Sequence, residues 1–183
     1  LINLGPLPSL KTLKIVGQTL GMTSGVLKSL SGLHAPVLED VELGSLSLED
    51  IEPLSICKSI KRLNLKKSPA LTSIKALKNS ASTLELLDLS DCESIKNLDS
   101  LKGASKLQSL YLEGCKTIDS LLPLSDSKAL TDITFSGLTQ IKSLAGLVGP
   151  FITTQNKRFG NKYLMISDCT ALASLNGLPP LDP

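Results

Sequence analysis

The chain has 183 residues, of which 42% are hydrophobic, so it is long enough to bury the core of one domain. Aromatic residues make up only 3% and tryptophan is absent, which leaves branched aliphatic side chains to fill that core. The formal net charge of +2 is too balanced for a general nucleic-acid or membrane binder, because such proteins usually carry a field of one sign. No apolar stretch reaches the roughly 18 residues of a membrane span, and no signal peptide is recognisable.

One phrase of about 23 residues recurs along most of the chain. Its clearest copies run from Leu84 to Lys106 and from Leu107 to Ala129, and both follow the pattern LxxLxLxxCxxIxxLxxL. Self-similarity at a period of roughly 20 to 29 residues predicts a solenoid, in which each repeat packs only against its neighbours. We call each copy a rung. Aligned on the second leucine of the pattern, the sequence contains seven rungs, anchored at Leu13, Val41, Leu63, Leu87, Leu110, Ile133 and Leu164.

The residues around each anchor alternate between apolar and polar, as in the LDL of rung 4. This period of two predicts a short strand with one buried and one wet face, and stacked rungs predict a parallel sheet. After the strand the apolar spacing changes to three, as at Ile95, Leu98 and Leu101, which favours a 3₁₀-like or irregular return segment over an α-helix. A helical turn is expected only over Leu27 to Leu33, where this spacing loosens.

These seven motifs in register resemble the leucine-rich repeat family, and the resemblance covers nearly the whole chain. The last repeat, from Leu164 to Leu181, and the opening segment, from Leu4 to Gly17, are similar to repeats of plant intracellular nucleotide-binding immune receptors. The CxxIxxLxxL tails look like the cysteine-type repeats of protist proteins. The resemblance implies a curved, right-handed α/β-type solenoid with parallel strands on the concave face, mostly 3₁₀ or irregular returns on the convex face, and ligands held on the concave face.

We expect residues 1–183 to form a single domain of about seven repeats. Both ends of the sequence fall inside a repeat, and neither shows the polar cap that an open solenoid needs for solubility. The chain is therefore expected to be a segment of a longer protein, or to have its ends covered by other subunits.

Three of the four cysteines, Cys92, Cys115 and Cys169, occupy the same position of the repeat. In leucine-rich repeats this position points inward at the corner after the strand, where a small polar group satisfies buried backbone groups. A disulfide or a metal site is the alternative, although no CxxC pair or Cys/His cluster is present. Cys57 falls in a return segment and carries no visible chemistry. Free buried thiols favour a reducing compartment, so the cytoplasm is the predicted location.

The period-two alternation also predicts which strand residues face outward, and their charge is banded. Rungs 1 and 3 are basic, rungs 2 and 4 are acidic, and later rungs are nearly neutral. The basic segment KRLNLKK of rung 3 can be interpreted as a nucleic-acid patch or as one partner of cross-strand ion pairs with the acidic rungs beside it. The predicted partner-binding residues on this face are Lys61, Arg62, Lys66, Lys67, Leu86, Asp88, Tyr111, Glu113, Tyr163 and Met165.

Within this set we expect a shallow contact patch centred on rungs 4 to 7, because Tyr and Met are enriched at protein interfaces. Two insertions interrupt the period, at about residues 18–35 and 148–162. Insertions in a solenoid map to loops that often make contacts. Phe151 and Phe159 lie in the second insertion and either fold back onto the domain or contact a partner.

The sequence offers no catalytic arrangement. His34 is the only histidine and lies in an irregular stretch with no obvious acid or nucleophile beside it. Neither GxGxxG nor GxxxxGK[ST] occurs, so no cofactor is expected. We therefore predict a non-enzymatic module that binds protein partners through its concave face and insertion loops, with no nucleic acid and no membrane span. The alternatives are a ligand-sensing segment of a plant-type immune receptor and a structural subunit of a large assembly.

Overall fold

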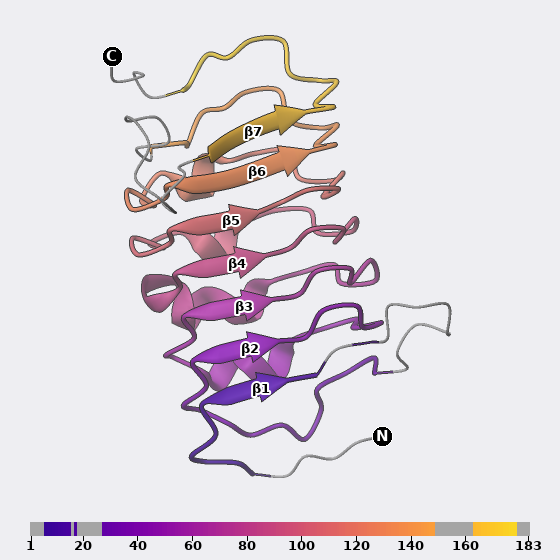
Figure 1. The fold of residues 1–183 in the computed structure, drawn as a ribbon, viewed down its shortest axis with the longest axis vertical. Helices are drawn as coiled ribbons and strands as arrows, with labels where there is room; N and C mark the ends of the chain where they lie inside the picture. Colours follow the sequence, from indigo (N-terminus) through magenta and orange to yellow (C-terminus); the bar gives the residue numbers. More distant parts are fainter. Residues whose placement is uncertain (1–5, 16, 18–26, 149–162, 179–183) are drawn as a thin grey trace, which may run out of the picture.

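The computed structural model describes residues 6–15, 17, 27–148 and 163–178. Seven parallel strands stack in chain order into one sheet (Figure 1). The strands are β1 (Thr12–Lys14), β2 (Asp40–Glu42), β3 (Arg62–Asn64), β4 (Leu86–Asp88), β5 (Ser109–Tyr111), β6 (Asp132–Ser136) and β7 (Tyr163–Ser167). Each is too short to be stable alone, so the sheet exists only because neighbouring rungs supply its hydrogen bonds.

The strand register places all seven predicted anchors in one row across the sheet. Leu13 pairs with Val41, Val41 with Leu63, and the series continues through every rung to Leu164 of β7. A slip of one residue would turn the apolar side chains outward, so the buried alternation fixes this register. The alignment of repeats and the expected parallel sheet are confirmed.

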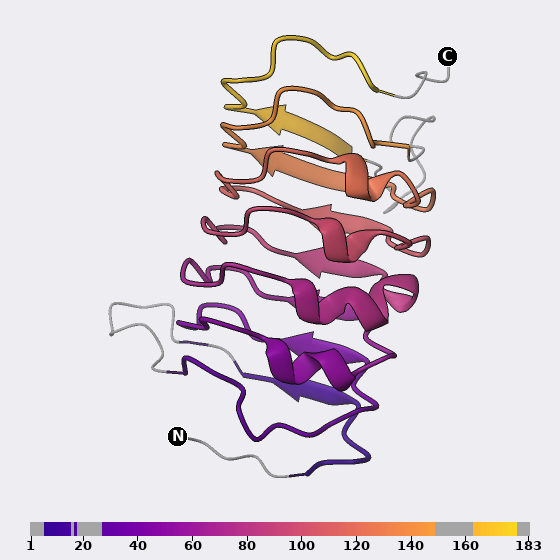
Figure 2. The same cartoon turned by 180° about the vertical axis from the view of Figure 1, so that it is seen from behind.

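Short 3₁₀ helices cover the side opposite the sheet (Figure 2). They are η1 (Glu52–Ile56), η2 (Lys75–Thr83), η3 (Asp99–Leu101) and η4 (Leu122–Leu124). The described returns of rungs 6 and 7 contain turns in place of a helix. The period of three therefore correctly predicted the character of the return segments.

The helical turn expected over Leu27 to Leu33 is wrong. This stretch is irregular and ends in a turn at residues 31–32. Gly32 has a φ of 87°, which interrupts any right-handed helical continuation. Leu30 and Leu33 are nevertheless buried and join the core.

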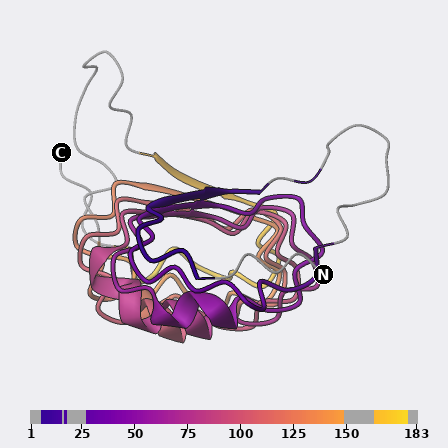
Figure 3. The same ribbon diagram turned by 90° about the horizontal axis from the view of Figure 1, so that it is seen from below.

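The view along the stack places the sheet on one side and the return segments on the other (Figure 3). The buried side chains of both form one hydrophobic core. In rungs 3 to 5 every leucine and isoleucine of the repeat pattern is at most 2% exposed, among them Leu63, Leu87 and Leu110 at 0%. Equivalent side chains in rung 1, such as Leu10 and Leu13, are only partly buried and pack against this core.

A left-handed residue follows each strand from β2 to β7 at the same position of the repeat. Glycine fills it at Gly114 and Gly137, with φ of 72° and 73°. The other four rungs use non-glycine residues with φ between 52° and 60°, namely Ser45, Lys67, Asp91 and Asp168. From rung 2 to rung 6, the backbone N–H of this residue donates to a carbonyl of the next rung, as from Asp91 to Glu113 at 2.6 Å. The corner is therefore held by the backbone, and glycine, serine, lysine and aspartate all occur there in different rungs.

The corner cysteines tie neighbouring rungs together. The Cys92 thiol donates to the Leu65 carbonyl at 3.2 Å, and the Cys115 thiol donates to the Leu89 carbonyl at 3.1 Å. Burial raises the pKa of Cys92 to about 12 and raises that of Cys115 as well, so both groups are thiols. This confirms the predicted corner role.

None of the four cysteines forms a disulfide bond in this structure. Cys169 is only partly buried, and its thiol donates to the Ser167 carbonyl of its own rung at 3.3 Å.

The return side has a similar set of bonds that the sequence did not reveal. The Cys57 thiol donates to the Ala35 carbonyl at 3.2 Å, and the Ser80 hydroxyl donates to the Cys57 carbonyl at 2.7 Å. Thr83 donates to the Ile60 carbonyl at 2.9 Å. Cys57 is thus a structural residue that satisfies a buried carbonyl in the adjacent rung.

Candidate interaction surface

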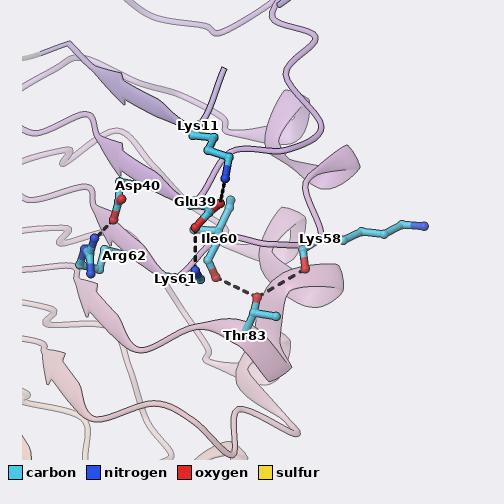
Figure 4. Close-up of polar contacts among 8 residues, drawn as sticks. All are labelled: Lys11, Glu39, Asp40, Lys58, Ile60, Lys61, Arg62 and Thr83. Atoms are coloured by element: carbon cyan, nitrogen blue, oxygen red, sulfur yellow. Dashed lines mark hydrogen bonds and ion pairs between the residues drawn. The ribbon is translucent and has the colours of Figure 1, made fainter. Parts of the chain in front are cut away.

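The outer face of the sheet consists of two chemically different parts. In rungs 1 to 3 the charged side chains pair across neighbouring strands (Figure 4). Glu39 lies between Lys11 and Lys61, with N···O distances of 2.9 and 2.6 Å. Arg62 pairs with Asp40 at 2.5 Å. Lys14 pairs with Glu42 at 2.8 Å.

These contacts confirm cross-strand pairing as the interpretation of Lys61 and Arg62. The two lysines lower the pKa of Glu39 to about 2, first through the hydrogen bond from Lys61 and then through Lys11. The pKa of Lys61 is raised, mainly by the same bond to Glu39. The acidic second rung therefore neutralises much of the basic charge beside it.

An open groove of about 440 Å³ lies over β1 to β4 on this paired part. Its walls include the paired side chains of Lys14, Glu42, Asp40 and Arg62, and Leu86 borders it. The ionic groups that line it already satisfy one another, so it presents little unbalanced charge to a ligand.

Lys66 and Lys67 lie where β3 turns into the corner, and neither forms an ion pair with the rest of the described chain. The side chain of Asn64 accepts the backbone N–H of Lys66 at 2.9 Å, and Lys67 occupies the left-handed position with a φ of 60°. Both lysines therefore belong to the rim of the sheet. They differ in this respect from Lys61 and Arg62, which form ion pairs with rung 2.

In rungs 4 to 6 the outer face carries half-buried carboxylates. Asp88, Glu113 and Asp132 form no ion pair with any described residue. Asp88 accepts the backbone N–H of Ser90 at 2.9 Å, which fixes its carboxylate at the end of β4. The acidic charge of this part is thus available to a partner.

Tyr111 lies at the centre of these carboxylates. Its hydroxyl donates to Oδ2 of Asp132 at 2.6 Å. Burial raises the pKa of Tyr111 to about 12, and the charges of Asp132 and Asp88 add to the rise. A ring that is partly buried and held by a charge-assisted hydrogen bond is a rigid contact group.

Two apolar side chains flank this centre. Leu86 of β4 is half-buried, and Met165 of β7 is 49% exposed. Tyr163 starts β7 opposite Asp132, but its side chain lies outside the described part of the chain. We call Leu86, Asp88, Tyr111, Glu113, Asp132 and Met165 the acidic patch.

The predicted contacts Phe151 and Phe159 lie outside the described residues, as do residues 18–26 of the first insertion. His34 is exposed, and its backbone forms a parallel bridge with Pro6. Among the described residues no group of three or more His, Cys, Asp or Glu side chains is arranged to hold a metal ion. The same residues include no helix long and apolar enough to cross a membrane.

Asp132 was not among the predicted contact residues, although the patch depends on it. Asp132 comes one residue before Ile133, which is the β6 anchor paired with Leu110 of β5, whereas Tyr111 comes one residue after Leu110. The diagonal contact between neighbouring strands is visible only once the register is known, because long side chains reach diagonal neighbours as well as opposite ones. The period-two alternation predicts that Asp132 and Tyr111 both face outward, but it does not predict that they form a hydrogen bond.

The solved structures that are similar to this chain include two internalins of Listeria monocytogenes. Internalin C2 is 21% identical, with a TM-score of 0.52 over 91% of this chain and 77% of that chain. InlF is 22% identical, with a TM-score of 0.57 over 64% of this chain, and the match spans only 37% of the InlF chain. No protein-family model matches the sequence, and neither does any curated protein.

At these identities the likeness establishes the fold and nothing finer. The similarity to plant-receptor and cysteine-type repeats stays a prediction. The internalin neighbours and the single seven-stranded parallel sheet confirm a curved, right-handed leucine-rich repeat solenoid with its strands on the concave side.

Proposed function

We propose that this chain is a non-enzymatic protein-interaction module that binds a protein partner through the acidic patch on its concave face. The observation that carries the proposal is the contrast along the sheet. Glu39, Asp40 and Glu42 are occupied by cations of neighbouring strands, whereas Asp88, Glu113 and Asp132 have no ion pair among the described residues. A rigid tyrosine surrounded by such carboxylates is suited to contact with another protein.

The chemistry of the patch favours a partner that presents lysine or arginine. A guanidinium or ammonium group can pair with Asp88 or Glu113 while its stem packs on the ring of Tyr111. Exposed Met165 offers an adaptable apolar contact beside them. The same carboxylates repel phosphate groups, which supports the expectation that the concave face does not bind nucleic acid.

The second insertion is proposed to contribute to the same contact through Phe151 and Phe159, since it directly precedes β7. We also propose one domain over residues 1–183 and a reducing, cytoplasmic location, because all four cysteines are free. The receptor-sensor and assembly-subunit alternatives differ from a simple module in their context. A nucleotide-binding domain in the same polypeptide would support the sensor, and a stable high native mass would support the subunit.

The test compares two double variants of the chain as bait for partner capture with crosslinking and mass spectrometry. Tyr111→Ala with Tyr163→Ala removes the aromatic groups, and Lys66→Glu with Lys67→Glu reverses the basic rim. The proposal expects capture to fall about tenfold or more with the tyrosine pair, as for interface anchor residues, and to change little with the lysine pair. Capture that depends only on the lysines contradicts the patch.

A matched control keeps the test independent of folding. Asp88→Asn is expected to reduce capture without changing the circular dichroism spectrum or the unfolding midpoint, because the amide oxygen of asparagine can still accept the backbone N–H of Ser90 while the negative charge is removed. Unchanged capture with Asp88→Asn would show that the charge of this residue plays no part in recognition.

A further inference from the structure

A second groove, of about 490 Å³, lies on the opposite side of the molecule, between the returns of rungs 3 and 4. The helices η2 and η3 that border it run side by side on the face shown in Figure 2. Lys75 and Lys78 line it from η2, and Asp99 and Lys102 line it from the return of rung 4. No part of the proposed concave-face contact uses this groove.

The groove has an excess of positive charge. Three lysines against one aspartate leave a formal charge of +2. Lys102 pairs with Asp99 at 2.9 Å, but Lys75 and Lys78 form no ion pair within the described ranges. Two ammonium groups one helical turn apart on η2 are therefore available to an anion.

Two neutral side chains in the lining have hydrogen-bond donors left over. The hydroxyl oxygen of Ser73 accepts the backbone N–H of Lys75 at 3.2 Å, and Oδ1 of Asn97 accepts the backbone N–H of Asp99 at 3.2 Å. Because these bonds use the oxygens as acceptors, the hydroxyl proton of Ser73 and the amide protons of Asn97 can still be donated.

Ser100 supplies an independent observation. It lines the groove and is only 8% exposed, yet its hydroxyl has no hydrogen-bond partner among the described residues. Buried polar groups are usually paired, and among the unpaired side-chain atoms of the described residues the hydroxyl of Ser100 is the one that belongs to this groove. The repeat itself does not need this hydroxyl, because the equivalent residues of the other rungs are Pro53, Ala76, Pro123, Gly146 and Gly177.

We infer that this groove binds a phosphate-type dianion carried on a phosphorylated serine or threonine side chain of a protein. Its lining consists of donors and cations, and a phosphate group offers the several acceptor oxygens that such a lining requires. The basic surface is small because an acidic residue lies near it in each neighbouring return. Exposed Glu52 lies on η1, and Asp126 accepts the Gly103 N–H beside η3 at 3.1 Å. A membrane surface or a nucleic acid calls for a longer basic track.

The experiment titrates the ¹⁵N-labelled chain with N-acetyl-phosphoserine amide, with the unphosphorylated compound and with inorganic phosphate. We expect shifts of the amides of residues 73–78 and 97–102 with the phosphoserine compound, weaker shifts with inorganic phosphate, and none with the unphosphorylated compound. An absence of shifts with both phosphate compounds overturns the inference.

Two matched pairs of lysine variants distinguish a specific anion-binding site from general electrostatic attraction. Lys75→Gln with Lys78→Gln is expected to weaken binding about tenfold or more. Lys58→Gln with Lys96→Gln removes the same charge from exposed positions outside the groove and should leave binding unchanged. Equal losses in both variants contradict a built site.

Ser100→Ala tests the buried hydroxyl directly. Alanine is the natural residue at this position of rung 3, so the fold should be retained, while binding of the phosphoserine compound falls severalfold. Unchanged binding contradicts the inferred site, because the buried hydroxyl would then have no part in it. Binding to anionic vesicles that is stronger than phosphoserine binding and lost with the Lys75, Lys78 variant would assign the groove to a membrane and overturn the protein partner. The Tyr111→Ala, Tyr163→Ala variant should bind the phosphoserine compound normally, which keeps this test separate from that of the concave face.

Discussion

Rungs 1 to 3 and rungs 4 to 7 carry the same strands in the same register, yet their outer faces differ. In the first group Glu39 forms ion pairs with Lys11 and Lys61, so the acidic second rung neutralises charge on the rungs on both sides of it. In the second group Asp88 and Asp132 form no ion pair with a described residue, and Tyr111 lies between them. In a solenoid the backbone makes every rung geometrically equivalent, so the outward residues alone decide whether a face is satisfied or available for binding.

The largest expected effect tests whether the two groups share one core. Leu63 of β3 and Leu110 of β5 are both 0% exposed at equivalent anchor positions. We expect Leu63→Ala and Leu110→Ala each to lower the free energy of unfolding by about 2–5 kcal/mol, through lost burial and the cavity left behind. Urea unfolding followed by circular dichroism measures both. A much smaller loss in one variant would show that the two groups are packed differently.

The next effect concerns the left-handed corner. A side chain added at Gly114 would combine a φ of 72° with a Cβ 2.8 Å from Oδ1 of Asp91. Gly114→Ala is therefore expected to destabilise the chain by about 1–3 kcal/mol. The reverse change at the equivalent position of rung 2, Ser45→Gly, should be neutral or stabilise by up to about 1 kcal/mol, because it relieves the strained φ of 60°. Thermal unfolding compares the two, and a stabilising Gly114→Ala contradicts the assigned corner geometry.

A smaller effect is expected on the pH dependence of stability, because the ion-paired face of rungs 1 to 3 contains a carboxylate with a lowered pKa. The pKa of Glu39 is lowered from 4.5 to about 2 in the folded chain. Its contribution to stability is therefore present above its ordinary pKa and is lost as the pH falls toward 2. Glu39→Gln should be less stable than the wild type at neutral pH and equally stable near the acid limit, as measured by urea unfolding. Glu52→Gln is the control, since Glu52 is exposed with no described ion pair. A pH-independent difference for Glu39→Gln would exclude ion pairing as its cause.

The smallest effect probes the acidic patch at high pH. In a Tyr163→Phe background, absorbance of the phenolate should report a single Tyr111 titration at about 12. Because the folded pKa is raised, the related stability is present below the ordinary pKa of about 10 and is lost as the pH rises through the folded value. Asp132→Asn should move the titration toward that ordinary value. An unchanged titration would mean that burial alone raises the pKa of Tyr111.

The fold could be predicted closely because its signals are local. The anchors, the buried alternation around them and the corner cysteines each follow from a few neighbouring residues, and the structure confirms them. The helical turn expected over Leu27 to Leu33 failed for a local reason as well, since Gly32 takes a positive φ. The contact residues on the concave face were harder to predict than the fold. Lys61, Arg62, Lys66 and Lys67 look alike in KRLNLKK, but the first two are paired and the last two lie at the rim without a described ion pair.

The repeat pattern alone predicts the solenoid, the register of its rungs and the side of each strand that faces outward. These follow from a one-dimensional repeat with periods of two and three. The three-dimensional structure was needed to show which charges form ion pairs and that Tyr111 donates to Asp132. It was also needed to show that the hydroxyl of Ser100 is buried without a described partner beside a basic groove. The pairings join residues of adjacent rungs, and they depend on the conformations of individual side chains, which the repeat pattern does not encode.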